Sequence, residues 1–149
     1  MRTGIILPHQ TFTDERGSFT PVAVDYNEEQ WDQFNVVTNN NPWVFRGMHY
    51  QTDPAQTKCI KVVKGEIIDF FYDLETKQVQ QFHLTPDEFL YVPNTQAHGY
   101  CTLTPNTVVI YLVKGDYAPH SEHSIPWHTI QEIKDALPTD KIITSPKDS

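Results

Sequence analysis

The sequence predicts an all-β fold, a jelly-roll β-barrel or sandwich with only short peripheral helices. Short runs rich in Val, Ile, Phe and Tyr alternate along the chain with clusters of Pro, Asn, Asp and Gly. Helical periodicity is weak throughout the sequence. With 149 residues, the chain is long enough to bury one core but too short for two comfortable domains. We therefore expect residues 1–149 to form a single domain.

Nine runs have the composition and length of β-strands. They are residues 19–25, 35–38, 44–51, 58–64, 66–73, 80–84, 89–92, 97–102 and 107–113. The turns between them contain Asn-Pro, Asp-Pro, Pro-Asp and Pro-Asn pairs, which favour chain reversal. The sequence Val63-Lys64-Gly65-Glu66 predicts a paired central hairpin. Many short strands around such a hairpin indicate a cupin-type barrel, whose interior has room for a ligand.

Only two segments have helical character, residues 28–33 and 130–136, and each is long enough for about one turn or two. The Leu137-Pro138 and Ser145-Pro146 pairs predict an extended C-terminal tail, because the residue before a proline avoids helical backbone.

The composition excludes several classes of function. A net charge of −8 and a pI near 5.2 argue against a general nucleic-acid binder, which requires a basic face. The N-terminus lacks the pattern of a signal peptide, and no apolar run reaches membrane-spanning length. Cys59 and Cys101 form no Cys-x-x-Cys motif. We therefore expect a cytoplasmic protein that works in a reducing compartment, away from membranes.

Three side chains on two consecutive predicted strands have the chemistry for removing a proton beside a carbonyl group. His49 is a potential base, Lys58 a potential stabiliser of an enolate, and Arg46 a potential anchor for phosphate.

Alternation along a strand predicts which side chains share a face. It places Lys58, Ile60 and Val62 on one face, and likewise Phe45, Gly47, His49 and Gln51. Arg46 has the opposite parity. If Arg46 and His49 line one pocket, either Gly47 marks a β-bulge or Arg46 reaches in from the rim.

Several separated blocks resemble the dTDP-4-keto-6-deoxyglucose 3,5-epimerases, also called dTDP-4-dehydrorhamnose 3,5-epimerases, and their nucleotide-sugar relatives. The likeness covers nearly the whole chain in the right order. The blocks are Asp14-Glu15-Arg16-Gly17-Ser18-Phe19, Arg46-Gly47-Met48-His49-Tyr50-Gln51, Lys58 with Val62-Val63-Lys64-Gly65-Glu66, Asp69 with Asp73-Leu74, Val92-Pro93 with Ala97-His98-Gly99, Tyr111 with Tyr117-Ala118-Pro119, Glu122-His123 through Ile125-Pro126-Trp127, and the tail Ile143-Thr144-Ser145-Pro146-Lys147-Asp148.

The resemblance implies an isomerase of nucleotide-linked keto sugars. The hydrogens on C3 and C5 of a 4-keto sugar are acidic because removing either gives an enolate, which can be reprotonated from the opposite face. By resemblance, His49 is the base, Asp148 holds its other nitrogen, and Lys58 stabilises the enolate. Tyr111 would return the proton from the far face.

The resemblance also assigns binding roles and an assembly. Arg46 would bind the pyrophosphate, Tyr117 would pack on the sugar, and His98 and Gln51 would belong to the same substrate site. Arg16 and Phe19 would reach the nucleotide in a neighbouring subunit, which implies a homodimer with exchanged N-terminal strands. The expected partner is a nucleotide-linked keto sugar, most simply a dTDP-sugar.

We expect no metal and no other cofactor. Many cupins bind a transition ion through a His-x-His pair and a carboxylate, but Gln51 stands where the second histidine of such a pair would be, and Asp53 already lies in a turn. The question of a metal arises because His83, His98, His120, His123 and His128 are also present.

Departures from the family pattern leave the substrate open. The loop before Arg46 and the loop after Asp73 are both short, Pro21 stands where the family usually has a glutamate, and Glu75 stands where it often has an arginine. The nucleotide could be dTDP, CDP or GDP, and one carbon or two could be inverted.

Three other functions compete with epimerisation. One is a 3,4-ketoisomerase with the same histidine base, another a non-catalytic nucleotide-sugar-binding cupin, and the most distant a metal-dependent dioxygenase. Each chosen side chain also has an ordinary structural explanation, such as a solvated strand lysine for Lys58 or a frayed terminus for Asp148.

Overall fold

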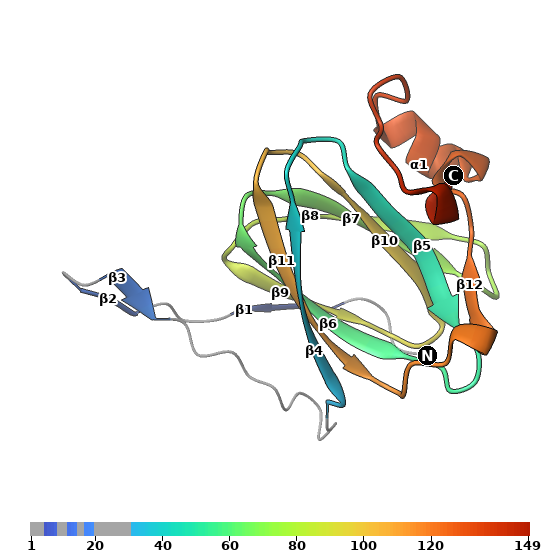
Figure 1. Cartoon of the computed structure of the whole chain (residues 1–149), viewed down its shortest axis with the longest axis horizontal. Helices are drawn as coiled ribbons and strands as arrows, with labels where there is room; N and C mark the ends of the chain where they lie inside the picture. The colour runs from blue at the N-terminus through green and yellow to red at the C-terminus, as the bar shows by residue number, and fades with distance from the viewer. Residues whose placement is uncertain (1–4, 9–11, 15–16, 20–30) are drawn as a thin grey trace.

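A computed structural model describes residues 5–8, 12–14, 17–19 and 31–149, with side chains from residue 31 onward. Two antiparallel five-stranded sheets form most of it (Figure 1). The first sheet has the order β1 (Ile5–Pro8), β9 (Glu88–Val92), β6 (Thr57–Lys64), β11 (Thr107–Lys114), β4 (Gln33–Asn39). The second has the order β12 (Glu122–Ser124), β5 (Phe45–Gln51), β10 (Gln96–Thr102), β7 (Ile67–Asp73), β8 (Val79–Leu84).

This arrangement confirms the all-β jelly-roll prediction. Eight of the nine predicted strands agree with β4 to β11 within one or two residues at each end. Of the ninth, residues 19–25, only Phe19 lies in the described part, at the end of β3 (Gly17–Phe19), which pairs with β2 (Phe12–Asp14). The sequence prediction missed β1, β2 and β12, which are too short to show a clear pattern. The single-domain prediction remains a prediction.

The central hairpin was predicted wrongly. Gly65 has a φ of +91° and turns the chain between β6 and β7, but these strands belong to different sheets. β6 pairs with β9 and β11, whereas β7 pairs with β8 and β10. A tight turn fixes where the chain reverses. Which strands then pair depends on which sheet faces are buried, and at Gly65 the chain crosses from one sheet to the other.

The helices are short, as predicted, but only one lies where it was expected. Helix α1 spans Gln131–Ala136 and buries Ile133. The other helix was predicted at residues 28–33. Residues 28–30 of that segment lie outside the described part of the chain, and Gln33 belongs to strand β4. The tail is not wholly extended, because Pro146–Asp148 forms one 3-10 turn.

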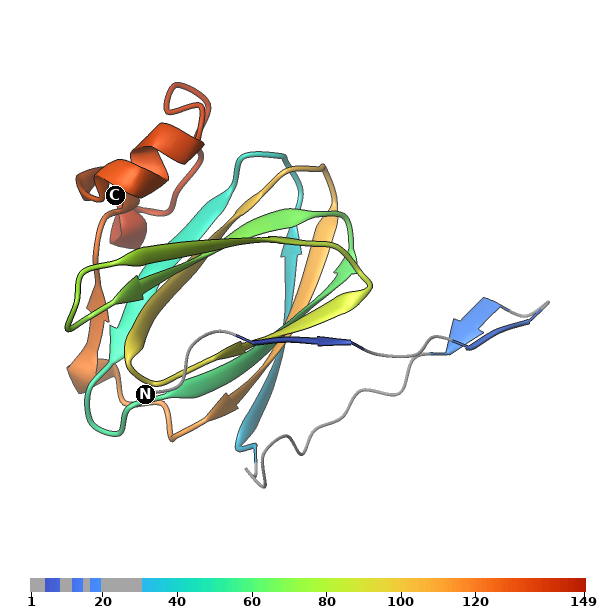
Figure 2. The ribbon, with the colours of Figure 1, turned by 180° about the vertical axis from the view of Figure 1, so that it is seen from behind.

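Two large apolar cores, and a small cluster of Cys59, Phe89 and Leu112, hold the described part of the chain together. The first lies between the sheets and includes Ile60, Phe71, Leu90 and Val109. The second lies on the outer face of the second sheet, where α1 and the segments around it cover Phe45. Figure 2 shows this C-terminal segment beside β5 and β12, at one end of the sandwich. The second sheet therefore has apolar residues packed on both faces, with Tyr100 of β10 in the inner core and Phe45 of β5 in the outer core.

A β-bulge in β5 explains how Arg46 and His49 both face the interior. His98 of β10 pairs with His49 and Tyr100 pairs with Arg46, so three steps along β5 match two along β10. Gly47 has a φ of +120°, and a Cβ atom there would lie 2.5 Å from the Cα atom of Gly99. The predicted bulge at Gly47 is confirmed. The predicted sharing of a face by Phe45 and His49 is wrong, because the bulge turns Phe45 into the outer core.

Candidate active site

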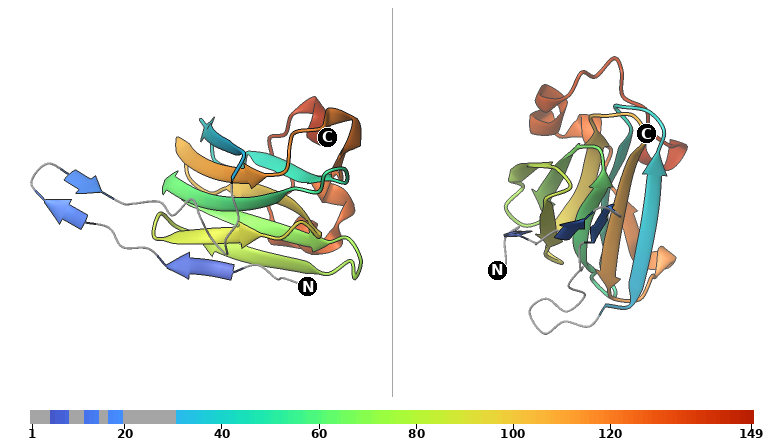
Figure 3. Two further views of the ribbon diagram at one scale, coloured as in Figure 1. Left: turned by 90° about the horizontal axis from the view of Figure 1, so that it is seen from below. Right: turned by 90° about the vertical axis from the view of Figure 1, so that its left-hand side faces the viewer.

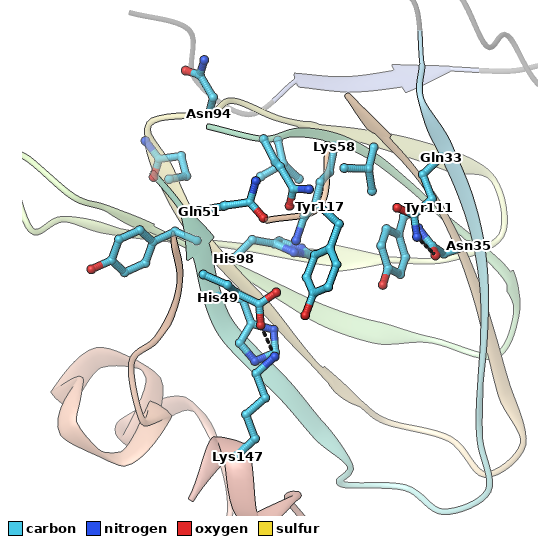
Figure 4. A pocket seen from close by; sticks show the side chains of 16 residues that line it. Gln33, Asn35, His49, Gln51, Lys58, Asn94, His98, Tyr111, Tyr117 and Lys147 are labelled. Carbon is cyan, nitrogen blue, oxygen red and sulfur yellow. Dashed lines mark hydrogen bonds and ion pairs between the residues drawn. The ribbon is translucent and has the colours of Figure 1, made fainter. Parts of the chain in front are cut away.

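A cavity with two adjoining compartments, of about 290 and 240 Å³, opens between the sheets. The side chains that line both compartments are His49, Lys58, His98, Tyr111 and Lys147. Figure 4 shows His49, Lys58, His98 and Tyr111 gathered around the same space. The residues that the sequence placed on two consecutive strands therefore converge on one site.

The two sheets supply opposite walls of this cavity. His49 of β5 and His98 of β10 are paired residues in the second sheet. Lys58 of β6 and Tyr111 of β11 lie on neighbouring strands of the first sheet, with the Lys58 Nζ atom 5.8 Å from the centre of the Tyr111 ring. Strands β5 and β6 follow each other in sequence but belong to different sheets. A ligand in the cavity would meet histidine on one side and lysine and tyrosine on the other.

His49 forms a close pair with the penultimate residue of the chain. The Asp148 Oδ1 atom lies 2.5 Å from His49 Nε2. Asp148 is buried, and its two oxygens also accept hydrogen bonds from the backbone N–H of Gly47 at 3.1 Å and from the Ser124 hydroxyl at 3.3 Å. The carboxylate is thus held in one orientation by three donors. With Nε2 carrying the shared proton, Nδ1 of His49 keeps the free lone pair that a base needs.

The tail reaches this position along strand β5. Ile143 donates its N–H to Trp43 O at 2.9 Å and accepts from Phe45 N at 2.9 Å, which forms a parallel bridge at Val44. The 3-10 turn Pro146–Asp148 then brings the carboxylate over His49. Lys147 of the same turn pairs with Glu122 of β12. Far from frayed, the tail is part of the cavity wall.

The electrostatics of the cavity favour a neutral His49. Burial lowers the pKa of His49 below its usual value, with Asp148 opposing and the charges of Lys147 and Lys58 adding to the effect. Burial also lowers the pKa of Lys58, which Glu122 and Asp69 partly offset. A histidine with a lowered pKa is unprotonated at neutral pH, as a general base has to be.

On the opposite wall, Tyr111 holds its proton firmly. Burial raises the pKa of Tyr111, against the charge of Arg46. Tyr111 is therefore a protonated phenol at neutral pH. In the described part of the chain, neither Lys58 nor Tyr111 has a hydrogen-bond partner. Both can thus donate into the cavity.

His98 belongs to a second, fully buried pair. Its Nε2 atom lies 2.8 Å from Asp69 Oδ2. Burial raises the pKa of Asp69, while His98 and Lys58 act in the opposite direction. The second carboxylate oxygen, Oδ1, has no hydrogen-bond partner among the described residues. This pair fixes the His98 ring behind the cavity.

Arg46 stands at the edge of the smaller compartment. Its Nε atom donates to Asn39 Oδ1 at 2.7 Å, and one terminal nitrogen donates to Thr38 O at 3.4 Å. The guanidinium is exposed, so its remaining N–H groups are available for an anion. Arg16 lies outside the described residues, as does the side chain of Phe19, and their predicted contacts stay predictions.

Gln51 and Tyr117 also line the larger compartment. The Gln51 amide donates to Pro54 O at 2.7 Å and Asp116 O at 2.8 Å and accepts from Ala118 N at 3.0 Å. Its polar group is occupied in fixing the loop that carries Tyr117. Tyr117 itself is 59% exposed, so its ring stands at the mouth of the cavity, where a sugar could pack on it. The predicted contact of Gln51 with substrate stays a prediction.

Comparison with known proteins identifies the family. A sequence model described as dTDP-4-dehydrorhamnose 3,5-epimerase matches residues 2–149, nearly the whole chain. The chain belongs to this family. The resemblance inferred from separated motifs is therefore confirmed, and with it the expectation of membership in a family of isomerases that act on nucleotide-linked sugars.

Individual relatives of the epimerase family agree with this assignment. The dTDP-4-dehydrorhamnose 3,5-epimerase of Neisseria gonorrhoeae is 31% identical over 140 residues, which cover 83% of this chain but 41% of that protein. The epimerase of Methanothermobacter thermautotrophicus is also 31% identical, over 83% of this chain and 73% of its own length. This chain thus spans about two fifths of the first relative and about three quarters of the second.

Solved structures of epimerases share the fold. The Bacillus anthracis enzyme, determined with TDP and PPi bound, has a TM-score of 0.83 and 32% identity over 97% of this chain and 90% of that one. The Legionella pneumophila enzyme, in complex with dTDP-4-keto-L-rhamnose, has a TM-score of 0.85 and 26% identity over 97% and 84% of the two chains.

Among the residues that sequence reasoning missed, Lys147 and Glu122 line the cavity, and Asn39 holds Arg46 at its edge. Lys147 and Glu122 both stand inside blocks that resemble the epimerase family, beside chosen residues, and that position was the signal that could have found them. Asn39 lay in a segment read only as a turn before Arg46, although the structure includes it at the end of β4.

Within the described part of the chain, no three His, Cys, Asp or Glu side chains are grouped as a metal site would require. In the same residues, no helix has the length and apolarity needed to cross a membrane. Cys59 and Cys101 are both free and buried.

Proposed function

We propose that this protein epimerises a dTDP-linked 4-keto-6-deoxy sugar at C3, C5 or both. The observation that carries the proposal is the His49–Asp148 pair, with a distance of 2.5 Å, on the wall of a cavity whose opposite wall carries Lys58 and Tyr111. Inversion at a carbon requires a base and an acid on opposite faces of the ring. These four side chains are arranged so that they meet this requirement.

The reaction follows from the protonation states. Nδ1 of neutral His49 removes the proton beside the ketone, and the Asp148 carboxylate stabilises the imidazolium that results. Negative charge develops on the C4 oxygen, where the Lys58 ammonium is placed to stabilise the enolate. Tyr111 then donates its phenolic proton to the carbon from the other face. The proton that His49 removes is replaced by one from Tyr111, so the sugar leaves as an isomer, and exchange with water restores neutral His49 and the Tyr111 phenol.

The diphosphate is assigned to the Arg46 side of the cavity. The lining of the smaller compartment includes Arg46, Lys58 and Lys147, a local concentration of positive charge in a chain whose net charge is −8. Relatives in this family carry TDP with PPi, or a dTDP-keto sugar, in their solved structures. We therefore place dTDP ahead of CDP and GDP.

The direct test is incorporation of deuterium from heavy water into dTDP-, CDP- and GDP-linked 4-keto sugars, followed by NMR at C3 and C5. Enzyme-dependent exchange at either carbon with the dTDP-sugar is the expected result, and it identifies the carbon. Absence of exchange with all three, while one of them binds, would make the protein a binding module and overturn the proposal.

Replacing the proposed acid separates epimerisation from the 3,4-ketoisomerase alternative. In Tyr111→Phe, proton removal by His49 is intact, so deuterium still enters the carbon, but inverted product falls by about 10²-fold because the far-face donor is missing. NMR of recovered sugar distinguishes exchange with retention from inversion. Appearance of a 3-keto product with the unmodified protein would instead establish the isomerase.

We also propose a homodimer assembled through β4 and the N-terminal strands. β4 ends its sheet in the described part of the chain, and Figure 3 shows it along that edge. Phe34 and Val36 on this strand are 54% and 61% exposed, an apolar row that a second copy would cover. A single species at twice the chain mass in sedimentation is expected, and Phe34→Lys should shift it toward monomer.

Free buried cysteines support our further proposal that the protein works in the cytoplasm.

A further inference from the structure

A second tyrosine faces the cavity from the wall that carries the histidines. Tyr100 of β10 lines the smaller compartment together with Arg46, Lys58 and Tyr111. Its side chain is buried within the core between the sheets. Its hydroxyl lies 3.3 Å from the amide nitrogen of Asn39, on the edge strand of the opposite sheet.

The direction of that hydrogen bond follows from the neighbour on the other side of Asn39. The Nε–H group of Arg46 can only donate, and it lies 2.7 Å from the Asn39 side chain, which must therefore present Oδ1 to it. The amide nitrogen Nδ2 then faces the Tyr100 hydroxyl at 3.3 Å and Thr107 O at 3.5 Å. An amide nitrogen donates and does not accept. The Tyr100 oxygen is thus the acceptor, and its own proton is not used by Asn39.

Among the described residues that proton has no hydrogen-bond partner, since the contact with Asn39 is the one hydrogen bond that the Tyr100 hydroxyl makes there. Burial raises the pKa of Tyr100 to about 12, so the phenol stays protonated at any physiological pH. A buried hydroxyl proton without a partner is unfavourable, whereas an acceptor on a ligand would satisfy it.

The geometry points to Tyr100 as a diphosphate-binding residue whose hydroxyl donates to a phosphate oxygen held by Arg46. One asparagine side chain joins the two groups, so a phosphate on the free N–H groups of Arg46 lies in the same compartment as the Tyr100 hydroxyl. Asn39 acts through the others as a positioning residue, because it orients Arg46 and leaves the Tyr100 proton free. This assignment deepens the proposed function and rests on it for the identity of the ligand.

The test is calorimetric binding of dTDP and of inorganic pyrophosphate to the full chain and to Tyr100→Phe. Loss of a hydrogen bond to a charged oxygen predicts dissociation constants about tenfold higher for both ligands. Tyr72→Phe is the matched control, because Tyr72 packs in the outer core away from the cavity, and its dissociation constants should stay within twofold. The unfolding midpoint of each variant, measured without ligand, reports whether packing has changed.

A second variant keeps the test independent of packing. In Asn39→Asp the new carboxylate accepts the Tyr100 proton and pairs with Arg46, so diphosphate binding weakens by more than tenfold. Adding Tyr100→Phe to this variant should change binding by less than twofold, because the proton has already been diverted. Independent, multiplicative effects of the two substitutions would overturn the assignment.

The possible outcomes distinguish the Tyr100 assignment from the epimerase function on which it rests. Unchanged pyrophosphate binding in Tyr100→Phe, with deuterium exchange intact in the unmodified protein, overturns the Tyr100 assignment alone. An effect on the keto sugar nucleotide that is absent with pyrophosphate also overturns it, because the donor would then serve the sugar. Weakened diphosphate binding in the variant, with no exchange by the unmodified protein, supports Tyr100 and removes the epimerase proposal.

Discussion

The two walls of the cavity differ in how their polar groups are partnered. On the wall of the second sheet, here called the base wall, His49 and His98 are each held by a carboxylate, Asp148 and Asp69. On the wall of the first sheet, here called the donor wall, Lys58 and Tyr111 have no hydrogen-bond partner in the described part of the chain.

This difference matches the two tasks. A base must present one nitrogen in one tautomer, so its other nitrogen needs a fixed acceptor. A donor to a developing enolate or to a carbanion must keep its protons for the substrate, so a protein partner would compete with catalysis. The two histidines of the base wall are held by partners within the protein, whereas Lys58 and Tyr111 of the donor wall leave their protons to the ligand.

The largest expected effect on deuterium exchange comes from removing the histidine base of the base wall. His49→Ala removes the group that abstracts the proton, and deuterium exchange should fall by roughly 10³- to 10⁴-fold with nucleotide-sugar binding preserved. His83→Ala is the control, since His83 pairs with Glu66 on the exposed surface, and it should keep its exchange rate. Exchange by His49→Ala at the unmodified rate would remove His49 as the base.

Next in size is the loss of charge from the donor wall. Lys58→Met keeps the length of the side chain but cannot stabilise an enolate, so exchange should fall by about 10²- to 10³-fold. The unfolding midpoint should not fall, because burial of the unpaired ammonium opposes folding at neutral pH, as its lowered pKa indicates. Lys64→Met on the exposed end of the same strand is the control. A clear drop in the unfolding midpoint would show that Lys58 is a structural residue.

Loss of the carboxylate that holds the base should be next. Asp148→Asn cannot stabilise the imidazolium, and exchange should fall by about 10²-fold. Because Asp148 raises the pKa of His49 against the effect of burial, its removal lowers that pKa further. The acidic limb of the pH–rate profile, which reports the protonation of the base, should therefore move to lower pH.

Asp140→Asn, which changes an exposed aspartate in the same C-terminal segment, should leave both the rate and the profile unchanged. A limb that moved to higher pH in Asp148→Asn would contradict the assigned pair.

The smallest expected effect on deuterium exchange comes from removing a single hydrogen bond to the Asp148 carboxylate. Ser124→Ala removes one of three donors to Asp148, at 3.3 Å, and should slow exchange roughly threefold, in line with a weak hydrogen bond. Thr129→Ala, whose hydroxyl bonds to Pro126 O on the surface, controls for loss of a hydroxyl. A loss as large as that of Asp148→Asn would mean that Ser124 does more than orient the carboxylate.

The fold was predictable where the pattern was local. Strands β4 to β11 followed from alternating β-branched and aromatic residues between turns, and the bulge at Gly47 followed from the conflicting parity of Arg46 and His49. The pairing of strands did not follow, because β6 and β7 are joined by a tight turn and yet lie in different sheets. Pairing depends on contacts between distant residues, which a local pattern does not contain.

The candidate site was likewise predictable where the signal was local and not where it depended on contacts between distant residues. His49, Lys58 and Tyr111 could be chosen from motifs, and the structure brings all three to one cavity. The resemblance already placed Tyr111 on the far face from His49. The position of Lys58 on the wall opposite His49 could not be predicted, since consecutive strands usually pair and β5 and β6 lie in different sheets. Tyr100 and Asn39 were missed because their significance lies in the direction of a hydrogen bond between two sheets, which no motif records.

The position of Asp148 also fixes the order in which the site is completed during synthesis. His49 and its carboxylate are 99 residues apart, and the last strand of the first sheet ends at Lys114. All described strands of the first sheet therefore emerge from the ribosome before Asp148 does, because synthesis proceeds from the N-terminus. At that stage, His49 would face the cavity without the partner that sets its tautomer. In the proposed mechanism, the pairing of Asp148 with His49 is therefore a late step in assembling the base.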